Sequence, residues 1–536
     1  MTRLSKDTFL KGALILTVAG IVVKIIGSVN RILLSRLLGG EGVGLYQMAY
    51  PIYLLALSVS SAGIPVAISI IVAEKLARND YRGANRVFRI SLGVLAATGL
   101  LFTFLLYYGA GWLIENHFVR DARAYYAIAA LAPAIFFVTV LSSYRGYFQG
   151  LQMMTPTAVS QIFEQLLRVI TMIVFAYILL PRGLEFAAAG ASFGAGPGAA
   201  AGLLVLLYFY WRHKPGFQHH MDTQPQIIQE SSVSIITRIV KLALPVSLAN
   251  IMLPVVSNID LLIVPARLEV AGYSVEQATE LFGYLTGMAV PLVNLATILT
   301  ASLAASLVPA VSEAYTLGNK QRIYQRIATA LRISNLITIP SFVGMWLLAT
   351  PISQMLYGTP NAGTSIAILS VGIFLLGIHQ VTTGVLQGLG HTAIPVINMG
   401  ISAVVKIIMS WLLTAMPALG IMGAAWATVA DFGVAALLNM FFVYRYIGFR
   451  LDIKDTMKAL VSSAVMGAVV LLAYDALMRH TLHNTLATLG SIVTGAAVFG
   501  IVLLLVGGVQ ARDIEQLPKI GGKMAAVLIK LRLLRR

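Results

Sequence analysis

The sequence contains no cysteine, and only 11% of its 536 residues are charged. The absence of cysteine excludes disulfides, thioether-attached haem and thiolate metal sites. A soluble chain of this length needs a more charged surface, whereas 58% of these residues are hydrophobic and the mean hydropathy is +0.84. The composition therefore predicts an all-α protein that crosses a membrane many times.

Motifs that would indicate catalysis are missing as well. The sequence has no Walker loop, no G-x-S-x-G, no H-E-x-x-H and no carboxylates paired at hydrolase spacing. His213, His219 and His220 lie in the longest polar break, 212–229, without acidic partners at ligand spacing. The glycine-rich run 190–202 favours close helix packing over catalysis. We therefore expect no enzyme, no metal site and no cofactor.

A formal net charge of +17 raises the question of a nucleic-acid partner. The basic residues are not gathered in a soluble module with aromatic platforms, so we expect no nucleic acid to bind. They are concentrated instead in alternate loops, near 75–89, 212–238, 320–326 and 445–454. Because cytoplasmic loops are enriched in lysine and arginine, both termini are expected in the cytoplasm. The basic tail 511–536 is expected either to lie on an anionic leaflet or to be a frayed end.

Apolar stretches of about twenty residues recur along the whole chain, and each is long enough to cross a bilayer as a helix. We interpret the first as a retained span, not a cleaved signal peptide, because Lys24 and Arg31 interrupt it. The stretches predict about fourteen transmembrane helices, at 11–36, 46–73, 88–114, 124–144, 157–180, 185–211, 239–265, 281–311, 327–351, 364–387, 394–415, 420–444, 458–478 and 487–508.

The two halves of the sequence repeat. MAYP at 48–51 recurs as MAVP at 288–291, and GYFQGL at 146–151 recurs as GVLQGL at 384–389. At displacements of 238 to 240 residues, Glu74 falls on Glu313 and Arg168 on Lys406. Because each half has six spans, we expect two parallel lobes related by an axis along the membrane normal. The expected domains are the N-terminal lobe 1–212, a cytoplasmic linker 213–235, the C-terminal lobe 236–450, helices thirteen and fourteen at 451–510, and the tail 511–536.

Cations occur inside the spans, where a charge costs at least about 3 kcal/mol. Lys24, Ser28, Arg31 and Ser35 recur at steps of three or four and so share one helix face. We expect this face to line a bundle interior or a water-filled cavity. A cationic cavity predicts an anionic substrate.

Two further polar stripes lie on the fifth and eleventh spans. They comprise Gln161, Glu164, Gln165 and Arg168 in the fifth, and Asn398, Ser402, Lys406 and Ser410 in the eleventh. The pair Glu164 and Arg168 fits a self-neutralising i,i+4 ion pair that joins helices equally well. That interpretation does not cover Lys24 or Lys406, which have no acid at such spacing.

Three acids lie at membrane depth, namely Glu164, Asp260 and Asp431. They are candidates for an ion-coupling site or for counter-ions to the cations. Asp260 with Arg267 predicts either a gate pair or a structural bridge.

Six segments resemble one known family: TFLKG at 8–12, VNR at 29–31, EGVGLY at 41–46, GIPVAIS at 63–69, RGYFQG at 145–150 and EQLLR at 164–168. These motifs are similar to those of the stage V sporulation protein B group. That group belongs to the polysaccharide-flippase branch of the multidrug/oligosaccharidyl-lipid/polysaccharide (MOP) superfamily. The resemblance runs through both halves and is most specific in the first.

The resemblance implies two six-helix lobes in a MATE-like V, with helices thirteen and fourteen forming a lipid groove. It implies export of an undecaprenyl-pyrophosphate-linked glycan, such as lipid II or a related cell-wall precursor, across the bacterial cytoplasmic membrane by alternating access. The implied partners are this lipid-linked anionic glycan, membrane lipids and cell-wall synthesis proteins. A first-helix cation of the related lipid II flippases falls on Lys24, whereas their charged pairs in helices two and eight have no counterpart at 48–56 or 284–291.

On this reading the substrate-binding residues are Lys24, Arg31, Arg168 and Lys406 for the headgroup, with Ser28, Gln161, Asn398 and Gln387 for hydrogen bonds to sugar or peptide. The alternative is a cation-coupled multidrug exporter of the same fold. Its site would be dominated by acids that attract cationic drugs, and it would have about twelve spans.

Overall fold

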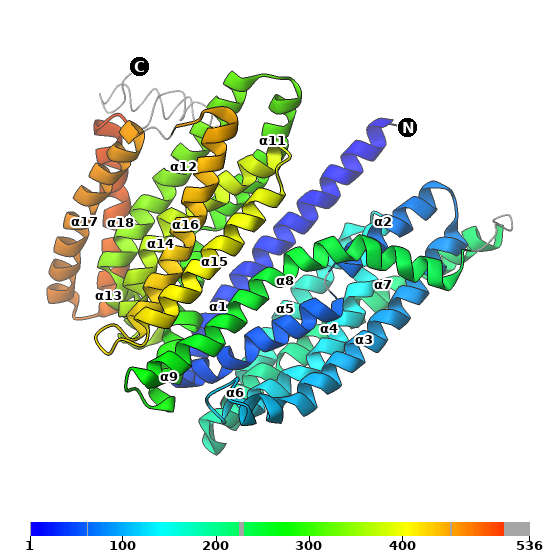
Figure 1. The fold of residues 1–536 in the computed structure, drawn as a ribbon, viewed down its shortest axis with the longest axis horizontal. Coiled ribbons are helices and arrows are strands. Elements are labelled where there is room, and N and C mark those ends of the chain that lie inside the picture. Colours follow the sequence, from blue (N-terminus) through cyan, green and yellow to red (C-terminus); the bar gives the residue numbers. More distant parts are fainter. Residues whose placement is uncertain (1, 62, 224–229, 451–452, 509–536) are drawn as a thin grey trace. The chain divides into compact units, whose positions relative to one another are not determined.

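The computed structural model describes residues 2–61, 63–223, 230–450 and 453–508, and every element within them is helical (Figure 1). The predicted all-α class is therefore confirmed. The expected basic tail, 511–536, lies outside the described residues. The chain forms two compact units, Met1–Glu269 with Tyr273–Gly283, and Val270–Gly272 with Tyr284–Arg536.

Thirteen helical stretches of the described residues are long and apolar enough to cross a membrane. All but the first coincide with one expected span each. The first, Ile15–Ala77, has 63 residues, about 95 Å as a straight helix, and covers the expected spans 11–36 and 46–73. Its backbone breaks at Gly39, where φ is 65° and two helices merge across a kink. The expected number of fourteen is not confirmed, because this stretch is counted once.

The first unit contains α1 (Thr2–Ser61), α2 (Ile64–Ala77), α3 (Tyr81–Glu115), α4 (Ala124–Gly150), α5 (Met154–Leu179), η1 (Leu180–Arg182), α6 (Leu184–Phe193), α7 (Ala195–Thr223), α8 (Ser232–Val270) and α9 (Val275–Phe282). Helix α4 is central, since α1, α2, α3, α6 and α7 all pack on it. Many of its buried residues are alanine, glycine or serine, and such small side chains let neighbouring helices approach closely.

Helix α8 opens the second half of the sequence repeat but belongs to the first compact unit. Ile235, Ile239 and Ala243 pack in the hydrophobic core that α2, α3, α4 and α7 build. At Gly63, where φ is +77°, a Cβ would lie 2.8 Å from Ser247 Oγ of α8. The domain boundaries expected from the repeat stay a prediction.

The second unit contains most of the π-helical turn η2 (Gly283–Ala289), then α10 (Val290–Ala296), α11 (Ile298–Thr316), α12 (Lys320–Leu347), α13 (Ala349–Tyr357), α14 (Gly363–Gly388), α15 (Ala393–Leu413), α16 (Ile421–Ile447), α17 (Ile453–Thr481) and α18 (Asn484–Leu505). Helix α14 is central here, packing on α10, α11, α12, α13 and α16. Helices α17 and α18 pack on each other, and α17 also packs on α12.

The repeat is visible in the local backbone geometry as well as in the amino-acid sequence. Asn79 and Gly318, 239 positions apart, both take a positive φ, of 57° and 66°. One residue later Asp80 and Asn319 cap α3 and α12, each side chain accepting a backbone N–H three residues on. Equivalent helix pairs also pack in each half. The contact of α4 with α7 corresponds to that of α14 with α16, and the contact of α5 with α7 corresponds to that of α15 with α16.

Candidate substrate-binding site

Three charged side chains meet inside the first unit, between α4 and α5. Glu164 Oε2 accepts a hydrogen bond from Arg145 Nη2, and Glu164 Oε1 accepts one from Arg168 Nη2, each at 2.8 Å. Arg145 Nε also donates to Ser160 Oγ at 3.1 Å. The three charged side chains are only 14 to 17% exposed. One carboxylate thus serves two guanidinium groups, and the cluster keeps one positive charge in excess.

Glycines at 190–202 let α6 and α7 pack closely against α5 beside this cluster. Gly190, Gly194, Gly198 and Gly202 recur every four residues and share one face. A Cβ at Gly198 would lie 2.7 Å from Arg168 Cβ, and one at Gly202 would lie 3.2 Å from Glu164 Cβ. The close packing predicted for the run 190–202 is confirmed. It encloses the stems of both charged residues.

Arg168 keeps an unused donor. Its Nε is buried and has no hydrogen-bond partner among the described residues. A buried donor without a partner is destabilising, so a carboxylate or phosphate oxygen that reached it would bind favourably. Arg31 of the first predicted stripe is half-buried on α1.

Arg145 was not expected as a site residue. The predicted span ended at residue 144, whereas α4 continues to Gly150, so Arg145 lies inside the helix. The available signal was its charge directly beyond an apolar run. The i,i+4 pair of Glu164 and Arg168 does form, but it does not neutralise itself, because Arg145 shares the same carboxylate.

Helix α1 carries the first predicted stripe past α5. A Cβ at Gly27 would lie 3.4 Å from Gln165 Nε2, and Asn30 Nδ2 donates to Met172 Sδ at 3.3 Å. Lys24 is exposed two turns before Arg31, and Ser28 donates to the backbone carbonyl of Lys24 at 3.0 Å. Gln161 is half-buried on α5.

In the second unit, the predicted stripe of α15 faces polar groups of α14 and α16. Ser402 Oγ donates to Asp431 Oδ1 at 2.6 Å, and Asn398 Nδ2 donates to Asn439 Oδ1 at 2.8 Å. Asn439 Nδ2 in turn donates to Thr383 Oγ1 at 2.9 Å. Lys406, one turn beyond Ser402, is 7% exposed. Asn398 and Ser402, both buried, are thus each hydrogen-bonded to a polar side chain of α16.

Two further site residues were predicted. Gln387 is exposed in the last turn of α14, and Asp260 is half-buried on α8. A gate pair or bridge between Asp260 and Arg267 stays a prediction. So does a cavity shared by Lys24, Arg31 and Arg168 of the first unit and Lys406 of the second.

A second charged cluster joins α1, the α3–α4 loop and α9 at the far end of α3. Arg123 donates to Glu41 Oε1 and to Asp121 Oδ2, each at 2.7 Å. Thr279 Oγ1 donates to the same Asp121 oxygen at 2.8 Å. The hydrogen bonds with Asp121 raise the pKa of Arg123 above its ordinary value. Two acids around one arginine give this cluster a net negative charge, so it does not suit an anion.

The histidines of the polar break lie on the C-terminal part of α7. His220 stacks on Tyr81 of α3, with ring centroids 4.9 Å apart. Within the described ranges, no three histidine, aspartate or glutamate side chains come together as metal ligands.

Comparison with known proteins identifies the family. The chain matches the model for polysaccharide biosynthesis proteins over residues 9–315 and the MatE model over 245–412. It is 32% identical to stage V sporulation protein B of Bacillus subtilis (strain 168), over 97% of this chain and 99% of that protein. It is 28% identical to the lipid II flippase MurJ of the same organism, over 86% and 87%.

Solved structures share the fold at lower identity. A MurJ lipid II flippase in an inward closed conformation aligns with a TM-score of 0.67 at 17% identity, over 91% of this chain and 98% of that one. An inward-facing multidrug resistance MATE transporter of the MOP superfamily aligns with the same TM-score and identity, over 80% and 94%. The chain is thus a multi-pass membrane protein with the MATE-like fold. It belongs to the stage V sporulation protein B group of the polysaccharide biosynthesis family, within the MOP superfamily.

Proposed function

We propose that this protein exports an undecaprenyl-pyrophosphate-linked glycan, lipid II or a related cell-wall precursor, across the bacterial cytoplasmic membrane. The observation that carries the proposal is the excess positive charge buried at Arg145, Glu164 and Arg168. A diphosphate is the kind of anion that arginine binds through paired, charge-assisted hydrogen bonds. The names of the relatives, stage V sporulation protein B and lipid II flippase MurJ, support the same substrate class.

In this proposal the glycan diphosphate takes over contacts that Glu164 makes with the arginines. Glu164 holds Arg145 and Arg168 against their mutual repulsion. A phosphate oxygen replaces the carboxylate on Arg168 and reaches its unused Nε. Both arrangements are charge-assisted, so the exchange changes the free energy little and leaves the substrate free to depart.

The remaining predicted residues complete the site. Lys24, Arg31 and Lys406 add positive charge for the headgroup, and Ser28, Gln161, Asn398 and Gln387 offer hydrogen bonds to sugar or peptide. Rocking of the two lobes would open the site to one side of the membrane and then the other. Glu164, Asp260 and Asp431 are the candidates if an ion is coupled to this motion.

The proposed orientation has both termini in the cytoplasm. The absence of native cysteine makes the test direct, since every introduced cysteine is a unique thiol. Cysteines placed at Asn79 and at Asn319 should react with a membrane-impermeant maleimide only after the membrane is opened. A cysteine at Asn116 should react in intact cells. The reverse pattern would invert the orientation.

The proposed driving force is the membrane potential acting on an anionic substrate. Each charge that crosses 100 mV gains about 2.3 kcal/mol, which biases the distribution about fifty-fold. Purified protein in liposomes with a fluorescent lipid-linked diphosphate, and a potassium and valinomycin potential, measures this bias. Vesicles containing Arg168→Ala provide the control. The electrophoretic mechanism fails if a proton or sodium gradient drives flipping and the potential has no effect.

The proposed substrate has a cellular test. The gene should restore growth to a bacterial strain depleted of its lipid II flippases, and Arg168→Ala should not. The alternative, a cation-coupled multidrug exporter, predicts no rescue. It predicts instead that an intact proton or sodium gradient drives a cationic dye out of the same cells.

A further inference from the structure

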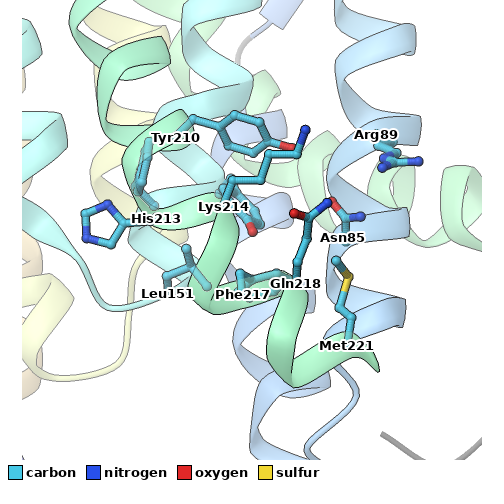
Figure 2. Close-up of a pocket in the computed structure, with 11 residues that line it drawn as sticks. Asn85, Arg89, Leu151, Tyr210, His213, Lys214, Phe217, Gln218 and Met221 are labelled. Atoms are coloured by element: carbon cyan, nitrogen blue, oxygen red, sulfur yellow. The ribbon is translucent and has the colours of Figure 1, made fainter. Parts of the chain in front are cut away.

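A small cavity opens at the start of α3, at the end of that helix away from the Asp121 cluster. Its volume is about 30 Å³. It lies between α3 and α7 and is floored by the end of α4 (Figure 2). Its lining includes Asn85, Arg89, Tyr210, Lys214 and Gln218.

The polar side chains of the lining converge because of helical spacing. Asn85 and Arg89 are four residues apart on α3, and Lys214 and Gln218 are four apart on α7, so each pair shares a face. In Figure 2 the amide of Gln218 points toward Asn85 across the gap, and Lys214 extends toward the hydroxyl of Tyr210. The lining contains no carboxylate. Its chemistry is that of an anion site.

The two cations of this cavity have no acidic partner among the described residues. Within the part of the chain that the structure describes, neither Arg89 nor Lys214 forms an ion pair. Neighbouring cations at the same end are paired, Lys75 with Asp80 and Glu230, and Arg238 with Glu74. The charge at the cavity is therefore available to a ligand.

Contacts between α3 and α7 hold the cavity in this shape. Arg82 Nε donates to the carbonyl of Met221 at 2.8 Å, which fixes the end of α7 against α3. Tyr81 packs edge-on against Phe217, with ring centroids 5.5 Å apart. The wall is thus built from tertiary contacts and is not a loose chain end.

Exposed aromatic residues near the cavity indicate headgroup depth. Tyr208 and Trp211, on the turn of α7 before it, are 56% and 65% exposed. Exposed tyrosine and tryptophan on membrane helices mark the boundary between lipid and water. The end of α4 adds apolar side chains to the lining, Phe148 and Leu151. A ligand here would therefore meet both cationic and apolar groups.

We propose that this α3–α7 pocket binds the phosphate of an anionic phospholipid. Its volume holds about two water-sized atoms, which matches the two non-ester oxygens of a phosphodiester. Lys214 and Arg89 supply charge, and the amides of Asn85 and Gln218 supply hydrogen bonds. The cavity of about 410 Å³ at Arg322 and Arg326 in the second unit has a smaller excess, because both arginines lie within 3.5 Å of Glu313, which offsets one of their two charges.

Lipid titration of the purified full-length protein tests the pocket. Native mass spectrometry in detergent, with phosphatidylglycerol, phosphatidylcholine or inorganic phosphate, gives the apparent dissociation constants. Each cation near a lipid phosphate contributes about fivefold in affinity. We expect phosphatidylglycerol to bind about twenty-five-fold more weakly to R89Q/K214Q, and Lys214→Arg to retain binding. Arg212→Gln, which removes a neighbouring charge of α7 outside the cavity lining, should bind as the unchanged protein does.

Three results would overturn the proposal. Equal binding of phosphatidylglycerol to R89Q/K214Q and to the unchanged protein would remove the pocket from lipid binding. Displacement of phosphatidylglycerol by millimolar inorganic phosphate would make it a site for soluble anions. Equal weakening by Arg212→Gln would mean that only general surface charge matters. The midpoint of thermal unfolding without lipid shows that each variant is folded, and Lys214→Glu is the second variant if the double one is not.

Discussion

The charged cluster of α4 and α5 and the polar network of α14, α15 and α16 occupy equivalent places in the sequence repeat. At a displacement of 238 residues, Arg145 falls on Thr383, Glu164 on Ser402 and Arg168 on Lys406. In the first unit these positions carry three charges that contact one another. In the second unit two of the three are hydroxyls, and the hydrogen bonds run to Asp431 and Asn439 of α16.

The helices that pack on the two clusters, α7 and α16, show the reverse pattern of polarity. Gly198 of α7 falls on Ala436 of α16, while Asp431 and Asn439 fall on Phe193 and Ala201. The first unit thus places its polar groups on α4 and α5 and packs them against glycine. The second recruits polar groups from the packing helix itself. Duplication has preserved which helices touch, and the chemistry at the contact has changed residue by residue.

The largest expected difference between the two clusters concerns their acids. Glu164→Gln would leave Arg145 and Arg168 facing one neutral amide. The NH₂ group of that amide cannot accept a hydrogen bond from either arginine. Removing one partner of a buried charge pair costs about 3–5 kcal/mol. Asp431→Asn retains an oxygen for Ser402 and should cost about 1 kcal/mol. Thermal unfolding in detergent compares them, and equal losses would contradict the difference drawn between the clusters.

Removal of the central cation should act on transport more than on stability. Arg168→Ala leaves Glu164 paired with Arg145, so the protein should still insert and fold. Loss of one charge-assisted contact should slow flipping about tenfold to a hundredfold. Arg168→Lys should keep part of the rate, because it keeps the charge. Lys24→Ala is the matched case on α1, and unchanged flipping in that variant would remove Lys24 from the site.

Exchanging the residues at the equivalent positions Gly198 and Ala436 tests the packing against each cluster. A Cβ at Gly198 would lie 2.7 Å from Arg168 Cβ and 2.8 Å from the backbone oxygen of Glu164. Gly198→Ala should therefore destabilise the first unit by about 2 kcal/mol through overpacking. The reciprocal Ala436→Gly should cost about 1 kcal/mol, the ordinary helix penalty of glycine. A stabilising Gly198→Ala would show that α7 can move away from α5 freely.

The smallest expected effect tests the repeat where it is best preserved. Asp80→Ala and Asn319→Ala each remove an N-cap, which costs about 1 kcal/mol. Asp80 should lose somewhat more, because it also pairs with Lys75. Thermal unfolding of the two single variants and of the double variant measures both losses. Strongly non-additive losses would mean that the caps do not act as independent local features.

Hydrophobic run length and the repeat predicted the fold well, because a bilayer tolerates only fully hydrogen-bonded helices of limited length. They predicted two separate spans on either side of Gly39, where the structure has a kink within one long helical stretch. They did not predict η2, where the backbone leaves α-helical geometry inside the expected span 281–311. Amino-acid composition alone does not distinguish a straight transmembrane helix from a kinked one. The helix count is therefore the part of the fold that the sequence left open.

The sequence by itself determined the membrane class, the two halves and the helix faces on which Arg168, Ser402 and Lys406 lie. These follow from periodicity along a single helix. Tertiary structure alone decided that Arg145 joins Glu164, that glycines enclose the pair, and that Asn439 links α14 to α15. The reason is physical: contacts between helices depend on crossing distance and rotation. Those are set by the packing of small residues on both partners at once.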